Sequence, residues 1–102
     1  MTEWLYRIVP TRPEMVSAPT PEERATVAAH FEYLVGLRDR GILILAGRTQ
    51  EEHGTFGITI FEADDEGSAR AVMDADPGVS GGVFAATLHP YAVAVTRDGL
   101  GG

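Results

Sequence analysis

Cysteine and lysine are both absent from this chain of 102 residues. Without cysteine there is no disulfide, no thiolate nucleophile, no iron–sulfur cluster and no cysteine-ligated zinc. Without lysine there is no Schiff-base chemistry, and so no covalently held pyridoxal phosphate. The three serines, Ser17, Ser68 and Ser80, do not lie in the G-x-S-x-G pattern of a nucleophile elbow. We therefore expect no covalent nucleophile, no cofactor and no metal.

Positive charge is scarce and scattered. Eight basic residues stand against 15 acidic ones, for a net charge of -7. Nucleic acids and anionic membrane surfaces are bound by clustered cations, so neither is an expected partner. No run approaches the roughly 18 apolar residues of a membrane span. The first residues, MTEWLYRIV, carry an acidic residue where a signal peptide has positive charge, and we expect a cytoplasmic protein.

The chain is organised around one amphipathic helix, expected from Pro21 to Gly41. Thr20 and Glu23 have the spacing of a capping box, and Gly41 supplies the stop. Apolar residues recur at spacings of three and four on the same face as His30, namely Val27, Phe31, Leu34 and Leu37. His30 is therefore expected to point toward the core, and it is the best single candidate for chemistry.

The remaining apolar segments predict strands. They are residues 3–10, 42–46, 55–61 and 83–89, with 91–95 as an extension or a fifth strand. A second, shorter helix begins at Asp64 or Asp65 and ends before Asp76-Pro77, because proline pushes the preceding residue out of the helical region. Residues 78–82 are expected to be a flexible turn. The order β-α-β-β-α-β(-β) predicts a ferredoxin-like α+β fold, an antiparallel sheet with two helices on one face.

A single domain over residues 1–96 accounts for this pattern, with residues 97–102 as a flexible C-terminal tail. The strands carry apolar residues on both sides, whereas both helices are expected to cover the same face. A large exposed apolar face is unfavourable in a monomer. We therefore expect a homodimer that packs sheet against sheet through the open face.

Several short motifs follow one another in a recognisable order. They are Arg12-Pro13, Pro21-Glu22-Glu23, His30 and Tyr33 in HFEYL, Gly41, Ala46-Gly47, Gly54, Gly57 and Asp76-Pro77. In this order and spacing, from Trp4 to about Val95, the chain resembles the YCII-related (YciI-like) family, a branch of the dimeric α+β barrel superfamily. Few members have an assigned reaction, so the resemblance implies a fold and a site but no common substrate.

The site that the resemblance implies lies in the cleft between helices and sheet, where a histidine of the first helix meets the aspartate of the DP pair. Here these residues are His30 and Asp76. A carboxylate bonded to one ring nitrogen of histidine fixes the tautomer and makes the other nitrogen more basic. Such a pair would act as a general acid and base near neutral pH.

Three further side chains are candidates for binding substrate. Arg12, in the proline-rich loop of residues 11–19, is either a solvated surface arginine or a clamp for a carboxylate or phenolate. Tyr33 contributes a hydroxyl to the site or serves only in packing. Arg48 stands where the family usually has the proline of a glycine-proline pair, and it adds a cation to one wall of the pocket.

Two functions of different class stay open. One is a small cofactor-independent enzyme in which His30 and Asp76 act on a small polar aromatic or carbonyl metabolite, by isomerisation, elimination, cyclisation or hydrolysis. Related dimeric barrels also host cofactor-free oxygenases. The other is a non-catalytic dimer that binds a small molecule or serves an accessory role. His30 is alternatively a core histidine, and a metal site with Asp76 and His89 lacks a recognisable ligand spacing.

Overall fold

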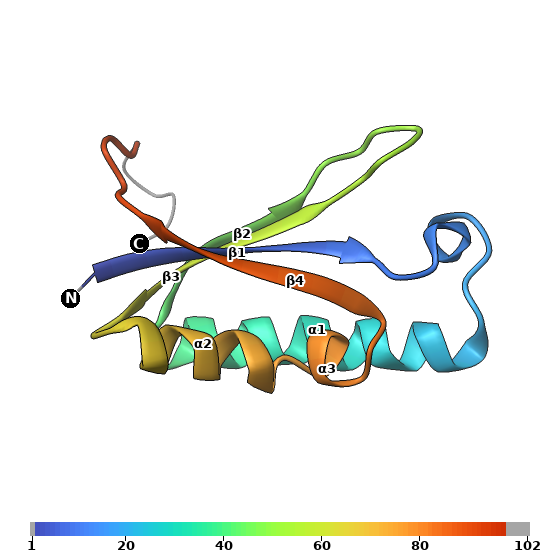
Figure 1. Cartoon of the computed structure of the whole chain (residues 1–102), viewed down its shortest axis with the longest axis horizontal. Helices are drawn as coiled ribbons and strands as arrows, with labels where there is room; N and C mark the ends of the chain where they lie inside the picture. Colours follow the sequence, from blue (N-terminus) through green and yellow to red (C-terminus); the bar gives the residue numbers. More distant parts are fainter. Residues whose placement is uncertain (1, 98–102) are drawn as a thin grey trace.

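The chain folds into two layers, a sheet and a layer of helices (Figure 1). The structure, a computed structural model, describes residues 2–97. Its elements in chain order are β1 (Thr2–Pro10), the 3₁₀ helix η1 (Pro13–Val16), α1 (Pro21–Asp39), β2 (Leu43–Arg48), β3 (Gly57–Ala63), α2 (Glu66–Ala75), α3 (Pro77–Ser80) and β4 (Phe84–Tyr91). This order confirms the predicted α+β fold. The predicted tail of residues 97–102 lies, except for Arg97, outside the described residues.

The four strands form one antiparallel sheet in the order β2-β3-β1-β4. β1 is central because it pairs with β3 on one side and with β4 on the other. The helices α1, α2 and α3 all lie against the same face of this sheet (Figure 1). Within residues 2–97 no helix is both long enough and apolar enough to span a bilayer.

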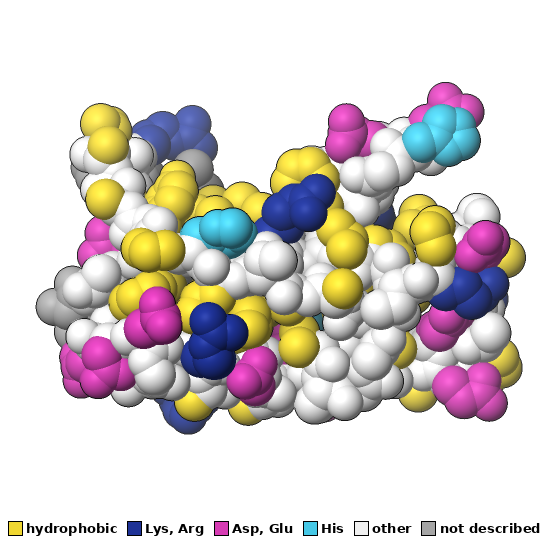
Figure 2. Space-filling model, viewed as in Figure 1, with side chains coloured by type: hydrophobic (Ala, Val, Ile, Leu, Met, Phe, Trp, Pro, Cys, Tyr) yellow, Lys and Arg dark blue, Asp and Glu magenta, His cyan; other side chains and the backbone are white. Residues whose placement is uncertain are grey.

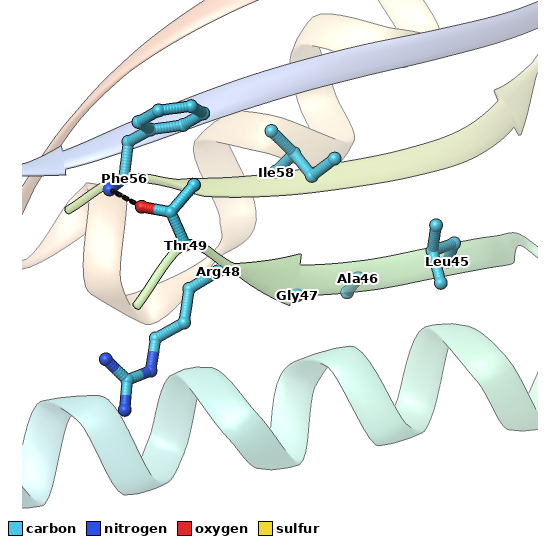
Figure 3. A pocket seen from close by; sticks show the side chains of 7 residues that line it. All are labelled: Leu45, Ala46, Gly47, Arg48, Thr49, Phe56 and Ile58. Carbon is cyan, nitrogen blue, oxygen red and sulfur yellow. Dashed lines mark hydrogen bonds between the residues drawn. The ribbon is translucent and has the colours of Figure 1, made fainter. Parts of the chain in front are cut away.

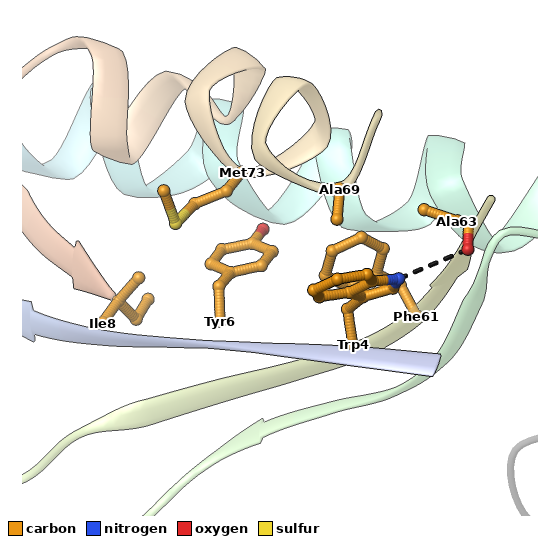
Figure 4. Close-up of a cluster of buried hydrophobic side chains, with 7 residues drawn as sticks. All are labelled: Trp4, Tyr6, Ile8, Phe61, Ala63, Ala69 and Met73. Atoms are coloured by element: carbon orange, nitrogen blue, oxygen red, sulfur yellow. Dashed lines mark hydrogen bonds between the residues drawn. The ribbon is translucent and has the colours of Figure 1, made fainter. Parts of the chain in front are cut away.

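The main core lies between the sheet and α2. Alternate residues of β1 point toward the helices, which is the period of two that a strand imposes. The cluster consists of Trp4, Tyr6, Ile8, Phe61, Ala63, Ala69 and Met73 (Figure 4). The rings of Tyr6 and Phe61 meet edge to face with centroids 5.7 Å apart. No residue of α1 belongs to this cluster, so α1 covers a different part of the sheet.

The ends of α1 follow the sequence expectation. The Thr20 side chain accepts a hydrogen bond from the backbone N–H of Glu23, and the Glu23 carboxylate accepts one from the backbone N–H of Thr20, so the capping box is confirmed. At the other end the helix stops at Asp39, and Gly41 has a φ of +74°, a left-handed conformation that suits glycine.

The predicted burial of the apolar face of α1 is wrong for half of its length. Leu37 is fully buried, but Phe31 is 66% exposed and Val27 is 36% exposed. Both side chains line a cleft between α1 and the sheet. The helical period identified the apolar face correctly, but part of this face lines the cleft and does not pack against core side chains.

Two expectations near the end of the chain are also corrected. Residues 78–80 are not a flexible turn, because Pro77–Ser80 form the helical turn α3 with Asp76 as its N-cap, and only Gly81 and Gly82 of the predicted segment form a turn. The break expected at Pro90 is absent, since β4 continues through it to Tyr91. β4 is an edge strand, where a missing backbone N–H is tolerated. From residue 92 to residue 97 there is no strand, so the described chain has no fifth strand.

Candidate active site

The polar centre of the site is Asp76, whose side chain is fully buried at the junction of α2 and α3. Its backbone is extended, with φ −64° and ψ 122°, as the following proline demands. Its Oδ1 accepts a hydrogen bond of 2.9 Å from the backbone N–H of Gly78 and so caps α3. The position of the carboxylate is therefore set by the backbone around it.

His30 reaches this carboxylate from α1. Its Nδ1 lies 2.8 Å from Oδ1 and 2.7 Å from Oδ2 of Asp76. The imidazole is 13% exposed, and it packs edge-on against Phe84 with ring centroids 5.2 Å apart. An ionised carboxylate only accepts hydrogen bonds, so we assign the ring proton to Nδ1. Nε2 then keeps its lone pair and is the atom available for proton transfer.

Tyr6 is a third member of this cluster, and the sequence analysis did not identify it. From β1, its hydroxyl donates a hydrogen bond of 2.7 Å to Oδ2 of Asp76. Burial first, and then the negative charge of Asp76, raise the pKa of Tyr6 far above its ordinary value, so the hydroxyl stays a donor. Its place among the inward residues of β1 indicated burial, but no pattern along the strand points to a partner 70 residues away.

A cleft of about 990 Å³ lies between α1, the loop after β1 and the β2–β3 hairpin, and His30 is part of its wall. Much of the lining is apolar, including Met15, Val16, Val27, Phe31, Phe56 and Phe84. Arg24, Arg38 and Arg48 add positive charge to it, and Glu32 adds one negative charge. A largely apolar pocket of this size with a few polar groups is typical of a site for a small molecule.

Arg48 stands across the cleft from α1, at the end of β2. Figure 3 shows its side chain extending toward α1, while Phe56 and Ile58 point to the other side of the hairpin. A second hollow of about 250 Å³ lies at the hairpin, and it shares Ala46, Gly47, Arg48, Phe56 and Ile58 with the large cleft.

Arg12 and Tyr33 lie outside this constellation. The Nε and Nη2 atoms of Arg12 donate to the two carboxylate oxygens of Glu23, at 2.9 and 2.7 Å, and Nη2 also donates to the carbonyl of Ala18. The Tyr33 hydroxyl donates to the backbone carbonyl of Val72 at 2.7 Å, and burial raises its pKa. Neither residue lines the cleft. Their roles in substrate binding stay predictions from the sequence.

His89 does not join His30 and Asp76. It alternates along β4 with Ala86 and Leu88, which pack against the core, so it lies on the opposite face of the sheet. Its Nε2 is 2.9 Å from the hydroxyl oxygen of Thr87. Across residues 2–97, no group of three or more His, Cys, Asp or Glu side chains is arranged to hold a metal ion.

Comparison with known proteins places this geometry in context. A family model, described as the YCII-related domain, matches residues 5–88. No curated protein matches the chain. A similar solved structure is 5-chloro-2-hydroxyhydroquinone dehydrochlorinase (TftG) from Burkholderia phenoliruptrix AC1100, in complex with 2,5-dihydroxybenzoquinone. It has a TM-score of 0.67 and 22% identity, over 92% of this chain and 96% of that chain.

A second solved structure is that of SnoaB, a cofactor-independent oxygenase from Streptomyces nogalater. It has a TM-score of 0.44 and 12% identity, over 96% of this chain and 99% of that chain. The likeness to the dehydrochlorinase shows a shared fold.

Proposed function

This chain belongs to the YCII-related family, in the dimeric α+β barrel superfamily, and we propose that it is a small cofactor-independent enzyme in which His30 is a general acid and base. The observation that supports this proposal is the pairing of His30 Nδ1 with the buried carboxylate of Asp76, at the wall of a large cleft. The chain has no cysteine, lysine or elbow serine to attack a substrate, so the histidine has no protein nucleophile to assist.

The proposed chemistry is a proton transfer. Nε2 of His30 takes a proton from a carbon next to a carbonyl group or from a phenol, and the electron pair moves onto the substrate oxygen. Asp76 stabilises the imidazolium that forms. In an isomerisation the electron pair returns from the oxygen, and the same proton is delivered to another carbon of the substrate. In an elimination the returning pair breaks the bond to the leaving group, which departs with the bonding electrons and takes up the proton. General acid–base catalysis of this kind contributes roughly 10²–10⁴ in rate. Isomerisation and elimination of a small polar aromatic or carbonyl compound fit this sequence of steps.

NMR of the histidine rings tests the pair without a substrate. In the Asp76→Asn variant we expect the Nδ1 proton resonance of His30 to move upfield, because a neutral amide oxygen accepts a weaker hydrogen bond than a carboxylate does. His53 and His89, which lie outside the pair, provide internal controls and keep their ring resonances. A His30 resonance that is the same in both proteins would remove the basis for a His–Asp pair.

Once a substrate is known, the His30→Asn variant distinguishes an enzyme from a protein that only binds the compound. An enzyme keeps its fold and loses about 10²-fold or more in kcat, because the group that moves the proton is gone. A binding protein has no turnover to lose, and the same change alters only its affinity.

The proposal includes a homodimer formed through the face of the sheet that the helices leave uncovered. Leu45 is 44% exposed and Tyr91 is 42% exposed, although both are large apolar side chains. Figure 2 shows hydrophobic side chains gathered over the strands with a few charged side chains among them, and further charged side chains on the β2–β3 hairpin and along the helical layer below. A second copy of the chain would remove this apolar surface from water.

A further inference from the structure

Positive charge is concentrated at the cleft of a chain that is acidic as a whole. The chain carries a net charge of -7, and its eight cations are all arginines. Three of these arginines, Arg24, Arg38 and Arg48, line the cleft, where a single acidic side chain, Glu32, accompanies them. The sign of the charge at the cleft is therefore opposite to that of the molecule.

Two of the three arginines are free to meet a ligand. Arg38 shares its charge with Asp39, whose Oδ1 lies 3.1 Å from Nη2. Arg24 and Arg48 form no ion pair within residues 2–97. Arg24 comes from α1, which also carries His30, and Arg48 extends toward that helix from β2 (Figure 3).

An arginine beside an apolar wall is well suited to hold an anion. Its planar guanidinium matches the two oxygens of a carboxylate, and the attraction grows where bulk water is displaced by the ligand. The apolar lining supplied by Val27 and Phe31 suits a ring or another compact apolar body, but it does not stabilise a charge.

We propose that the cleft selects a ligand with an anionic oxygen, a carboxylate or phenolate, on an apolar body, and that Arg48 is the residue that selects the charge. This inference rests on the proposed function, because it names the substrate class of the same site. Arg48 also has a use in the reaction. When His30 takes a proton, negative charge grows on the substrate oxygen, and a guanidinium across the cleft stabilises it.

Matched acids and amides test this selection with unreactive probes. Benzoate and salicylate are compared with benzamide and salicylamide, which have the same shape and no charge. Their affinities are measured by NMR titration at constant ionic strength. We expect the two acids to bind at least about tenfold more tightly than their amides. Arg48→Gln should abolish this preference and leave the affinity for the amides unchanged.

Arg70→Gln is the matched control, because Arg70 is an exposed arginine of α2 that does not line the cleft. It should change no affinity, and the NMR spectrum of each variant reports whether the fold is kept. The inference is overturned if none of the four probes binds, if the amides bind as tightly as the acids, or if the preference survives Arg48→Gln. A preference that only Arg24→Gln removes would also overturn the role of Arg48.

These outcomes are independent of the test of the His30–Asp76 pair. Benzoate undergoes no reaction, so its affinity does not depend on whether His30 moves a proton. A His30 ring resonance that does not respond to Asp76→Asn would end the proposed catalytic role and leave charge selection standing. Benzoate binding that ignores Arg48 would do the reverse.

Discussion

One buried carboxylate accepts hydrogen bonds from three elements of the protein. Asp76 receives the hydroxyl of Tyr6 from β1, the Nδ1 of His30 from α1, and the backbone N–H of Gly78 from α3. Each donor stabilises negative charge on the carboxylate, and each one also draws some of that charge away from the imidazole. We therefore expect Tyr6 to act as a positioning residue that affects His30 through Asp76.

Removing the Tyr6 hydroxyl should strengthen the hydrogen bond between His30 and Asp76. In Tyr6→Phe the carboxylate has one donor fewer, so it accepts more strongly from Nδ1–H of His30. We expect the Nδ1 proton resonance of His30 to move downfield, and the protein to lose about 1–3 kcal/mol of stability. NMR and chemical denaturation measure the two effects.

Tyr33→Phe is the matched control for this substitution. It also removes one phenolic hydroxyl, from a partly buried tyrosine, but that hydroxyl bonds to the carbonyl of Val72 and not to Asp76. The Nδ1 proton resonance of His30 should stay where it is in the wild type. Equal shifts in the two variants, or no shift in Tyr6→Phe, would show that Tyr6 does not act through Asp76.

Some members of this cluster can be identified from the sequence, and one cannot. His30 and Asp76 are found because the helix pattern and the DP pair mark them, and the resemblance to a family pairs them. Tyr6 is marked only as an inward residue of a strand. Its partner is decided by the way β1 and the α2–α3 junction meet, which depends on the whole fold and leaves no local signal.

At the scale of elements, the loop after β1 is held to α1 by the ion pair of Arg12 and Glu23. Its residues Met15, Val16 and Pro19 form part of the cleft wall, so the ion pair fixes one side of the site. The two hydrogen bonds from Arg12 and the backbone bond from Thr20 lower the pKa of Glu23 to about 2 from its ordinary value of 4.5.

This pKa predicts how Arg12→Gln depends on pH. A carboxyl group whose pKa is lower in the folded state stabilises that state above its unfolded pKa, and loses this effect as the pH falls toward its folded pKa. We therefore expect Arg12→Gln to lower the Tm near pH 7. The difference from the wild type should shrink between pH 4.5 and about 2.

Thermal unfolding followed by circular dichroism measures this difference. Arg38→Gln serves for comparison, because Arg38 and its neighbour Asp39 are both largely exposed and their ion pair is expected to add little. A difference for Arg12→Gln that is constant from pH 7 to pH 2 would contradict the assigned role of Glu23.

The first helix shows what an element's sequence determines and what it leaves open. Thr20, Glu23 and Gly41 predict both ends of α1, because caps act within one turn of the chain. Phe31 was predicted to be buried and is not. The repeat of three and four tells which side chains share a face, but the surface opposite that face is supplied by η1, β2 and β3, which are distant along the chain.

At the scale of the whole molecule, the uncovered face of the sheet predicts self-association. We expect light scattering after size-exclusion chromatography to give twice the mass of one chain. Leu5 lies on the central strand between the inward residues Trp4 and Tyr6, so its side chain is on the helix-free face. Leu5→Glu places a charge in the proposed interface and should yield monomers.

Ala71→Glu provides the control, since Ala71 is exposed on α2 within the helical layer. This variant should remain dimeric. A wild-type protein that keeps the mass of one chain, even at a concentration well above the dissociation constant of a stable dimer, would rule out the dimer. So would a Leu5→Glu variant that is folded and still dimeric.

The order of strands and helices was predictable because each element has its own period and its own breakers, such as Pro77 after α2. The continuation of β4 through Pro90 was not. A proline ends a central strand but is accepted at a sheet edge, and whether β4 is an edge depends on the pairing of all four strands.

The three side chains of the polar cluster also bear on how the protein folds. Asp76 is separated by 46 residues from His30 and by 70 from Tyr6, so its two side-chain partners are distant along the chain. No fragment that lacks β1, α1 or the α2–α3 junction contains the complete cluster. Long-range contacts of this kind form only when the sheet and the helices close on one another. We therefore expect the cluster of Tyr6, His30 and Asp76 to assemble in the same step in which the chain folds.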